Sequence, residues 1–574
     1  MAVFAAAAFI WPYHTSNPPR TLSPDADLLS GPHQDLRTIP SKPAVPTQFI
    51  DVAGPAGLAY QWSLDGQMPR NIEQIMGHGC AFLDYNNDGN LDILLVGKQM
   101  ALYAGDGHGH FQDVTHQAGL DALHGDFRGC AVGDYDGDGF DDIFLTGFHT
   151  AALLHNDHGK RFVDVTAKSG IDTRGWSTSA AWAELDNNGR LDLCVANYCQ
   201  FSDSLDHMST QLCPFDGIMS ACRPNTYGPE YARLYRNNGD GTFTDVTRLW
   251  GMDRADGYAL GVAFADVDGS GRRSLFVADD QAASDLFLNR GRAFTEIGRR
   301  AGVSYQEEGH GYAGMGVDWG DYDNDGRLDV FVTDYWNEKK RLLHNDGDCV
   351  FTNQFDQLHC DIGGYPRLAF GVKWLDYDND GWLDFVYCNG HTNDNVQQMN
   401  AAMPWKQPTL LYRNNEGKSF SNVSAGLVGD ALSSILGRGL AVGDFDNDGR
   451  VDILVVDDTG KPLLLHNETP GVGHWLEIKL IGTRSNRDGY GADIRATAGD
   501  LHLLRECHSD GSYESSSDSR LHVGLGPNTV VSDLSVTWPS GRVDRFSNVQ
   551  ADRVITIKEG QGVAGSGQPA GQAQ

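Results

Sequence analysis

The sequence predicts an all-β protein: a seven-bladed β-propeller closed by an N-terminal strand, followed by a small β-sandwich-like C-terminal domain. Three observations predict it. An acidic turn occurs seven times, each copy leads into an apolar strand, and six copies continue into a hairpin unit like "LYRNNGDGTFTDVT", which ends in F-x-D-V. The resulting unit of four short strands has the size of a propeller blade, so seven units predict seven blades.

Each repeat begins with a run of small residues such as "GRGLAVG", which suits an innermost strand where blades converge on a narrow channel. The acidic turn and the apolar second strand follow it. The seven copies are "DYNNDGNLDILLVG" from Asp84, "DYDGDGFDDIFLTG" from Asp134, "ELDNNGRLDLCVAN" from Glu184, "DVDGSGRRSLFVAD" from Asp266, "DYDNDGRLDVFVTD" from Asp321, "DYDNDGWLDFVYCNG" from Asp376 and "DFDNDGRVDILVVD" from Asp444.

The last repeat is incomplete in a way that predicts closure. It reaches "LLLHN" at 463–467 and lacks the F-x-D-V strand, whereas "FIDVAGPAGL" at 49–58 supplies that strand ahead of the first acidic turn. An N-terminal strand that completes the seventh blade joins the ring and removes two exposed sheet edges.

Charge restricts the class of partner. The 574 residues include 77 acidic and 44 basic ones, which gives a formal net charge of −33. Phosphates would be repelled, so we expect neither nucleic acid nor an anionic membrane surface as a partner. The carboxylates are either solvated or neutralised by bound cations.

The predicted boundaries leave two termini outside the domains. Residues 1–47 are interpreted as a signal or anchor remnant and a linker, with a disordered leader as the alternative. The propeller is expected over 48–468 and the C-terminal domain over 469–559, and 560–574 is expected to be disordered. No later segment reaches the roughly 18 apolar residues of a membrane span.

The acidic turn has the oxygen spacing of a calcium loop. D-x-D-x-D-G-x-x-D places side-chain oxygens at positions 1, 3, 5 and 9, and the glycine permits a tight loop. An EF-hand would need Glu at position 12 and flanking helices. The remaining alternative is an Asx-rich turn without metal.

Up to seven Ca²⁺ ions are therefore expected, with Ser270 and Ser274 weakening the fourth turn. The expected ligands are Asp84, Asn86, Asp88 and Asp92 in the first turn; Asp134, Asp136, Asp138 and Asp142 in the second; Glu184, Asp186, Asn188 and Asp192 in the third; Asp266 and Asp268 in the fourth; Asp321, Asp323, Asp325 and Asp329 in the fifth; Asp376, Asp378, Asp380 and Asp384 in the sixth; and Asp444, Asp446, Asp448 and Asp452 in the seventh.

These turns resemble the FG-GAP (or VCBS) repeats of integrin α-subunit propellers. The segment "HWLEIKLIGTRSNRDGYGADIRATAG", with "LHVGLG" and "VTWPSG", resembles an ASPIC/UnbV domain, and the combination resembles the cartilage acidic protein family. The resemblance implies an extracytoplasmic, calcium-binding protein that is secreted, periplasmic or surface-attached. One departure is "HSDGSYESSS" at 508–517, where family members often read S-G-S-G-Y-x-S.

Two cysteine pairs lie outside the core register. Cys213 and Cys222, and likewise Cys349 and Cys360, are close enough in sequence for a disulfide in an oxidising compartment, although spacing alone does not establish pairing.

Ligand binding is expected on the face opposite the acidic turns, where the second strands end and two long insertions, 199–230 and 391–408, emerge. The candidate ligand residues are His149, Tyr198, Tyr335, Trp336, Asn389 and His391. The alternative is that the histidines make structural hydrogen bonds and the aromatic rings pack the insertions. Asn486 to Asp488, in "SNRDGYGA", are interpreted as a turn network.

The favoured function is a secreted or surface-associated calcium-binding propeller that recognises an extracellular protein or carbohydrate. The alternatives are a hydrolase or lyase acting on polysaccharide, with its site opposite the calcium turns, and a structural envelope component. Nucleophile-elbow, P-loop and HExxH motifs are absent from the sequence, which favours binding over catalysis. A pocket with convergent His, Asp and aromatic residues on that face would favour the enzyme.

Overall fold

The computed structural model describes residues 46–564 apart from 201–210, 216, 255, 307–308, 362, 365 and 429–433. Most of the predicted leader and of the predicted C-terminal tail therefore lies outside the described residues. Within the described part of the chain, no helix has the length and apolar character needed to cross a membrane.

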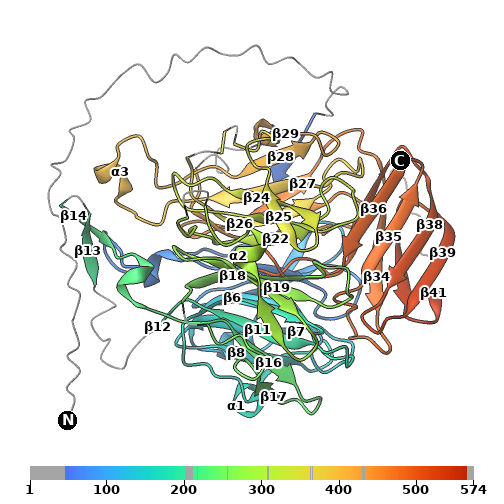
Figure 1. Cartoon of the computed structure of the whole chain (residues 1–574), viewed down its shortest axis with the longest axis horizontal. Helices are drawn as coiled ribbons and strands as arrows, with labels where there is room; N and C mark the ends of the chain where they lie inside the picture. Colours follow the sequence, from blue (N-terminus) through green and yellow to red (C-terminus); the bar gives the residue numbers. More distant parts are fainter. Residues whose placement is uncertain are drawn as a thin grey trace, which may run out of the picture. The chain divides into compact units, whose positions relative to one another are not determined.

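The described chain forms seven antiparallel sheets that follow the seven repeats (Figure 1). The innermost strands are β2 (Cys80–Leu83), β6 (Asp126–Gly133), β10 (Ser177–Ala183), β18 (Ala259–Ala265), β22 (Val317–Gly320), β26 (Ala369–Leu375) and β31 (Gly437–Gly443). The second strands are β3 (Asp92–Leu95), β7 (Asp142–Phe148), β11 (Asp192–Asn197), β19 (Ser274–Asp279), β23 (Asp329–Val332), β27 (Asp384–Asn389) and β32 (Asp452–Asp457).

The third and fourth strands form the outer hairpin of each blade. The third strands are β4 (Ala101–Gly105), β8 (Ala152–Asn156), β16 (Arg233–Asn237), β20 (Asp285–Asn289), β24 (Arg341–Gly347), β28 (Leu410–Asn414) and β33 (Leu463–Asn467). The fourth strands are β5 (Phe111–Asp113), β9 (Phe162–Asp164), β17 (Phe243–Asp245), β21 (Phe294–Glu296), β25 (Val350–Asn353), β29 (Phe420–Asn422) and, for the seventh blade, β1 (Phe49–Asp51). The short helices α1 (Thr166–Ser169) and α2 (Gly298–Ala301) follow two of these hairpins.

The predicted closure is confirmed. β1 pairs antiparallel with β33, with Phe49 opposite Asn467 and Asp51 opposite Leu465, and β30 (Leu427–Val428) adds in parallel to the outer edge of β1. Each innermost strand contacts the next one along the chain, and β31 of the seventh blade contacts β2 of the first. The ring is thus closed at a seam between the first and seventh blades.

The C-terminal domain is a sandwich of two four-stranded sheets (Figure 1, orange to red). One sheet has the order β37 (Leu521–Gly526), β34 (His474–Ile481), β40 (Arg553–Lys558), β41 (Gly562–Ala564); the other has the order β36 (Leu501–Glu506), β35 (Asp493–Ala498), β38 (Val530–Thr537), β39 (Val543–Gln550). Both sheets share one apolar core, which continues into Trp182 and Tyr135 of the propeller. The domain docks on the acidic-turn face, where it contacts Asp134 and Glu184.

The connection between β36 and β37, residues 508–518, enters the propeller channel. We call it the channel loop. Its hydrogen bonds reach every blade: Phe82 N–H to Ser516 O (3.1 Å), Cys130 N–H to Glu514 O (3.0 Å), Glu514 N–H to Ser179 Oγ (2.9 Å), Phe264 N–H to Asp510 Oδ2 (3.1 Å), Ser512 N–H to Val317 O (2.7 Å), Lys373 Nζ to Asp510 O (3.0 Å) and Asp518 N–H to Val442 O (3.1 Å). This segment is the one that departs from the family pattern.

The two insertions cover the opposite end of the channel. The first carries β12 (Cys199–Gln200) paired with β15 (Gly228–Pro229), and the hairpin of β13 (Leu212–Phe215) and β14 (Ile218–Ala221); the second carries α3 (Val396–Met399). The insertions meet where Ser220 Oγ donates to Asn395 Oδ1 (2.8 Å).

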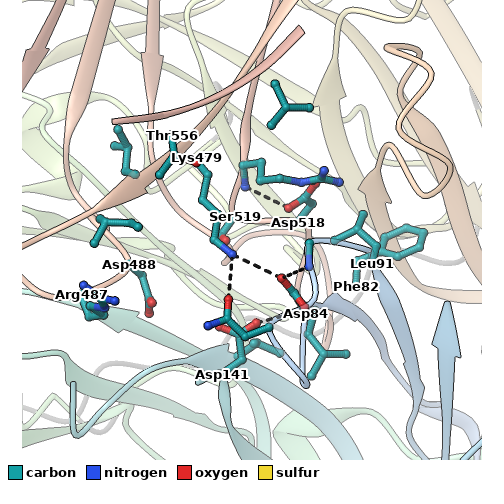
Figure 2. Close-up of a pocket in the computed structure, with 18 of the residues that line it drawn as sticks. Phe82, Asp84, Leu91, Asp141, Lys479, Arg487, Asp488, Asp518, Ser519 and Thr556 are labelled. Carbon is teal, nitrogen blue, oxygen red and sulfur yellow. Dashed lines mark hydrogen bonds and ion pairs between the residues drawn. The ribbon is translucent and has the colours of Figure 1, made fainter. Parts of the chain in front are cut away.

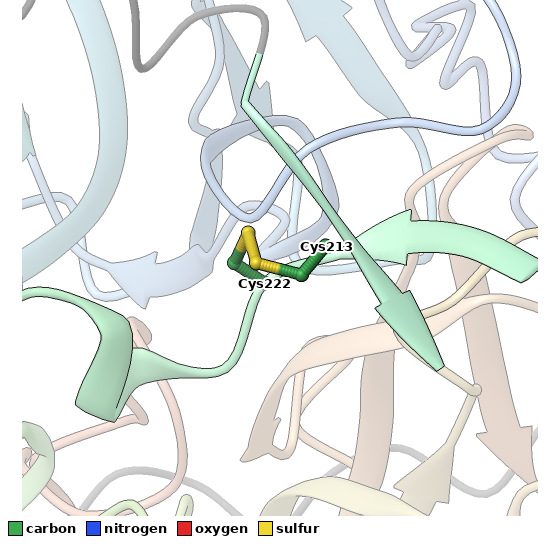
Figure 3. Close-up of a disulfide and its surroundings, with 2 residues drawn as sticks. All are labelled: Cys213 and Cys222. Atoms are coloured by element: carbon green, nitrogen blue, oxygen red, sulfur yellow. A yellow bond between two sulfur atoms is a disulfide. The ribbon is translucent and has the colours of Figure 1, made fainter. Parts of the chain in front are cut away.

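The predicted disulfide between Cys213 and Cys222 is present and closes the β13–β14 hairpin (Figure 3). The second possible pair is not formed. Cys360 is buried in an apolar cluster of the fifth and sixth blades, whereas Cys349 packs against the cluster shared by the fourth and fifth blades, and both thiols are free.

Candidate functional site: the acidic turns

Position 1 of each turn folds the loop around its carboxylate. In the fifth blade, Asp321 Oδ1 accepts the Asp325 N–H and Oδ2 accepts the Gly326 N–H, both at 3.1 Å. The same pair of bonds recurs in the sixth blade, from Asp380 and Gly381 to Asp376. These hydrogen bonds to the position 1 carboxylate shape the loop without requiring a bound ion.

Position 9 ties the loop to the third strand of its blade. Asp329 Oδ1 accepts the Asn345 N–H (2.8 Å), Oδ2 accepts the Tyr322 N–H (3.4 Å), and the side chain is fully buried. Burial raises the pKa of Asp329 well above its usual value. In the fourth turn Ser274 replaces this Asp, and its hydroxyl accepts only the Asn289 N–H (3.2 Å).

Positions 3 and 5 face a basic side chain from the third strand. In the fifth blade His344 Nε2 lies 3.2 Å from Asp323 Oδ2 and 3.5 Å from Asp325 Oδ2. In the sixth blade Arg413 donates to Asp378 Oδ2 (2.6 Å) and Asp380 Oδ2 (2.7 Å).

The same third-strand position has a similar role in three more blades. His155 lies 3.1 Å from Asp136, His466 lies 3.2 Å from Asp446, and Arg236 lies 2.9 Å from Asp186. Sequence reasoning did not identify these residues. Their signal was the residue before Asn in "LLHN" and "LYRN", which had been interpreted only as part of a hairpin.

The oxygens that remain fit a hard cation. In the fifth turn Asp321, Asp323 and Asp329 each offer an oxygen within 4.8 Å of the others. Among the residues that the structure describes, the buried Asp378 Oδ1 of the sixth turn has no hydrogen-bond partner, and neither does Asp446 Oδ1 of the seventh. Several carboxylate oxygens around one point are the ligands that Ca²⁺ prefers, so the predicted residues fit this ion.

The C-terminal domain contacts the turns on their outer side. Asn486 donates from its backbone N–H (2.9 Å) and its side-chain amide (3.0 Å) to Glu184 Oε2, and Asp488 Oδ2 accepts the Asp134 N–H (2.8 Å). Figure 2 shows Lys479 reaching toward Asp84, at 3.3 Å, in a cavity of about 460 Å³ between the two domains. The loop interpreted as a turn network is thus also a docking contact.

The candidate ligand residues on the other face are mostly covered. Tyr198 is 1% exposed and donates to Asp280 Oδ2 (2.6 Å), while Asn389 is buried and donates to Pro408 O (2.6 Å). His391 is 1% exposed, and burial lowers its pKa to about 3.

The remaining candidates differ in exposure. Tyr335 and Trp336 are half-buried and pack beside His391, with ring centroids 5.7 and 6.4 Å from it. His149 is exposed, with Nδ1 3.1 Å from Arg174 O. These contacts favour the packing alternative for the aromatic residues.

Comparison with protein families agrees with this geometry. The FG-GAP-like repeat matches residues 84–145, 134–195, 219–277, 266–332, 321–387 and 376–455, and the ASPIC and UnbV family matches 482–564. The chain belongs to the FG-GAP repeat family. The matched FG-GAP windows begin at or span the acidic turns that the structure places on one face.

Curated relatives align with about two thirds of the chain at 24% identity. Cartilage acidic protein 1 of Xenopus tropicalis is 24% identical over 397 residues, and that of Homo sapiens is 24% identical over 402 residues. Each alignment covers 66% of this FG-GAP chain, and the chain spans about half the length of these relatives, 54% and 53%.

Solved structures show weaker likeness. An Agrocybe aegerita lectin that recognises non-reducing terminal N-acetylglucosamine has a TM-score of 0.40 and 17% identity, covering 67% of this chain and 86% of that one. Streptogramin B lyase has a TM-score of 0.38 and 10% identity, covering 71% and 98%. The fold of this FG-GAP protein is therefore argued from its own blades.

Proposed function

We propose that this chain is a secreted or surface-associated calcium-binding propeller that recognises an extracellular protein or carbohydrate. The observation that carries the calcium part is the repeated cage, in which backbone N–H groups orient the position 1 and 9 carboxylates. At position 3 one oxygen, Asp378 Oδ1 or Asp446 Oδ1, accepts no hydrogen bond in the described chain. An acidic cage that holds no cation would oppose folding through repulsion between its carboxylates.

Calcium affinity is expected to differ among the turns because each third-strand side chain competes with the ion. Arg413 keeps its charge at any relevant pH and binds Asp378 and Asp380 together. An imidazole is a weaker base than a guanidinium, so we expect an ion to displace it more readily. The second, fifth and seventh turns, which have histidines, are thus proposed as the tightest sites, and the fourth turn as the weakest.

An extracytoplasmic location agrees with the disulfide between Cys213 and Cys222, because disulfides persist in oxidising compartments. It also agrees with the resemblance to cartilage acidic protein 1. Recognition is proposed for the face opposite the turns, since the C-terminal domain and the channel loop occupy the turn face and the channel.

Calcium binding is tested by melting the full chain in excess EDTA and in millimolar calcium. A ligand that binds only the folded state raises the melting temperature, and several sites add their effects. We expect a rise of more than about 10 °C, since roughly 1 kcal/mol moves the melting temperature of a large domain by a few degrees. An unchanged melting temperature would contradict the calcium proposal.

Recognition is tested separately by a glycan array and by a screen of extracellular-matrix proteins with the calcium-loaded chain. Binding that persists in denatured or EDTA-treated protein would contradict a role for the folded propeller. Binding to neither class would contradict recognition itself.

A further inference from the structure

A pocket of about 270 Å³ lies at the seam between the first and seventh blades, on the face opposite the acidic turns. Its wall includes Tyr60, Ser63 and His78, which precede the innermost strand of the first blade, and Gln99, which follows the second strand. We call it the seam pocket. Sequence reasoning did not select any of these four residues.

The imidazole of His78 is fixed by a buried carboxylate. Its Nδ1 lies 2.5 Å from Oδ1 of Asp458, whose side chain is fully buried and whose other oxygen has no hydrogen-bond partner in the described chain. A carboxylate at Nδ1 fixes the ring orientation and, in the neutral ring, makes Nε2 the acceptor. No described group makes a hydrogen bond to Nε2, and the ring lines the seam pocket.

The basic groups at the seam pocket are already paired with acids. Lys98 pairs with Asp65, and Arg128 pairs with both Glu73 and Asp126. The pocket therefore offers no unpaired positive charge to an anionic ligand. The groups left to act are Nε2 of His78, the hydroxyl of Ser63 and the amide of Gln99, beside the ring of Tyr60.

We propose that the seam pocket binds one uncharged sugar unit, with Nε2 of His78 hydrogen-bonded to a ring hydroxyl. An uncharged amide, a hydroxyl and an aromatic ring around an oriented imidazole match a ligand rich in hydroxyls, and the volume suits a single ring rather than a chain. The inference rests on the proposed recognition function and names its carbohydrate site.

The test titrates the full calcium-loaded chain with methyl glucoside, methyl galactoside and methyl mannoside by calorimetry, and follows the His78 ring nitrogens by NMR. We expect one glycoside to bind and to shift Nε2. His78→Gln and Gln99→Trp, which fills the pocket from an exposed position, should each weaken binding by about tenfold or more. His124→Gln, at an exposed histidine that precedes the innermost strand of the second blade, is the matched control.

Each outcome has a distinct meaning. Binding by the native chain that survives both pocket variants overturns the seam pocket while leaving recognition intact. No binding of any glycoside, here and on the array, overturns both the pocket and carbohydrate recognition. Preference for galacturonate over methyl galactoside would contradict the inference that the pocket has no unpaired positive charge for an anionic sugar. Because Gln99 makes no side-chain contact that the fold needs, Gln99→Trp stays informative even if His78→Gln unfolds.

Discussion

The acidic turns of the fifth and sixth blades have the same four carboxylates but contact different side chains of the third strand. Asp321, Asp323, Asp325 and Asp329 face His344, whereas Asp376, Asp378, Asp380 and Asp384 face Arg413. The turn sequences alone suggest equal sites. The third strand supplies an imidazole in the fifth blade and a guanidinium in the sixth, and Arg327 of the fifth turn also pairs with Asp325. We therefore propose that cation binding depends on two strands of the blade.

The comparison also separates two structural roles within the acidic turn. Positions 1 and 9 accept backbone N–H groups in both blades, so they shape the loop and join strands. Positions 3 and 5 contact the third-strand side chain, His344 or Arg413. Four predictions follow from this division, ordered from the largest expected effect.

Removing the position 9 carboxylate should destabilise both blades equally. Asp329→Ala and Asp384→Ala each leave two buried N–H groups without acceptors, and we expect each to lower the free energy of unfolding by about 3 kcal/mol. Urea unfolding measures this, with the exposed Asp361→Ala as control. If the losses in free energy of unfolding differ by more than about 1 kcal/mol, position 9 does not have the same role in both blades.

Removing the third-strand cation should have unequal effects. In EDTA, Arg413→Ala leaves Asp378 and Asp380 facing each other without a partner, and we expect a loss of about 2 kcal/mol that calcium largely restores. His344→Ala should cost less than about 1 kcal/mol in EDTA. Equal losses in the two variants would remove the distinction between the blades.

The seventh blade extends the comparison to pH. Hydrogen bonds to Asp446 and Asp448 raise the pKa of His466 from 6.5 to about 10. A raised pKa stabilises the fold below pH 6.5 and loses that contribution as pH rises toward 10. In EDTA the native chain should therefore lose about 1–2 kcal/mol relative to His466→Gln between these pH values. A constant difference across this range would contradict the assignment.

The third blade tests the outer side of the turn. Asn486→Ala removes the side-chain amide that donates to Glu184 and to Tyr490 O, and we expect a loss of about 1 kcal/mol. Faster hydrogen exchange at the interface with the C-terminal domain should accompany it. The exposed neighbour variant Arg484→Ala should change neither quantity.

Repeat periodicity was sufficient for the fold because each blade is a local unit. The alternation of small-residue strand, turn and hairpin predicts seven blades, and the displaced "FID" strand predicts the pairing of Phe49 with Asn467. The docking of the C-terminal domain on the turn face was not predictable this way. It depends on contacts such as Asn486 with Glu184, which join segments with no shared period.

The site was predictable in part for the same reason. The acids at positions 1, 3, 5 and 9 lie within nine residues, so their spacing can be recognised from the sequence. Arg413 and His344 reach the turn only after the third strand pairs with the second, so they require the sheet register. Tyr198 and His391 were expected near solvent, yet the insertions cover them, which loop sequences do not reveal.

Calcium titration of three chains tests the central claim most directly: the native protein, His344→Arg and Arg413→His. The account predicts that His344→Arg removes one tight calcium ion, that Arg413→His adds one, and that all three chains keep the same fold by circular dichroism. Identical calcium stoichiometry and affinity in the three chains would contradict the claim that the third strand decides which acidic turns bind calcium.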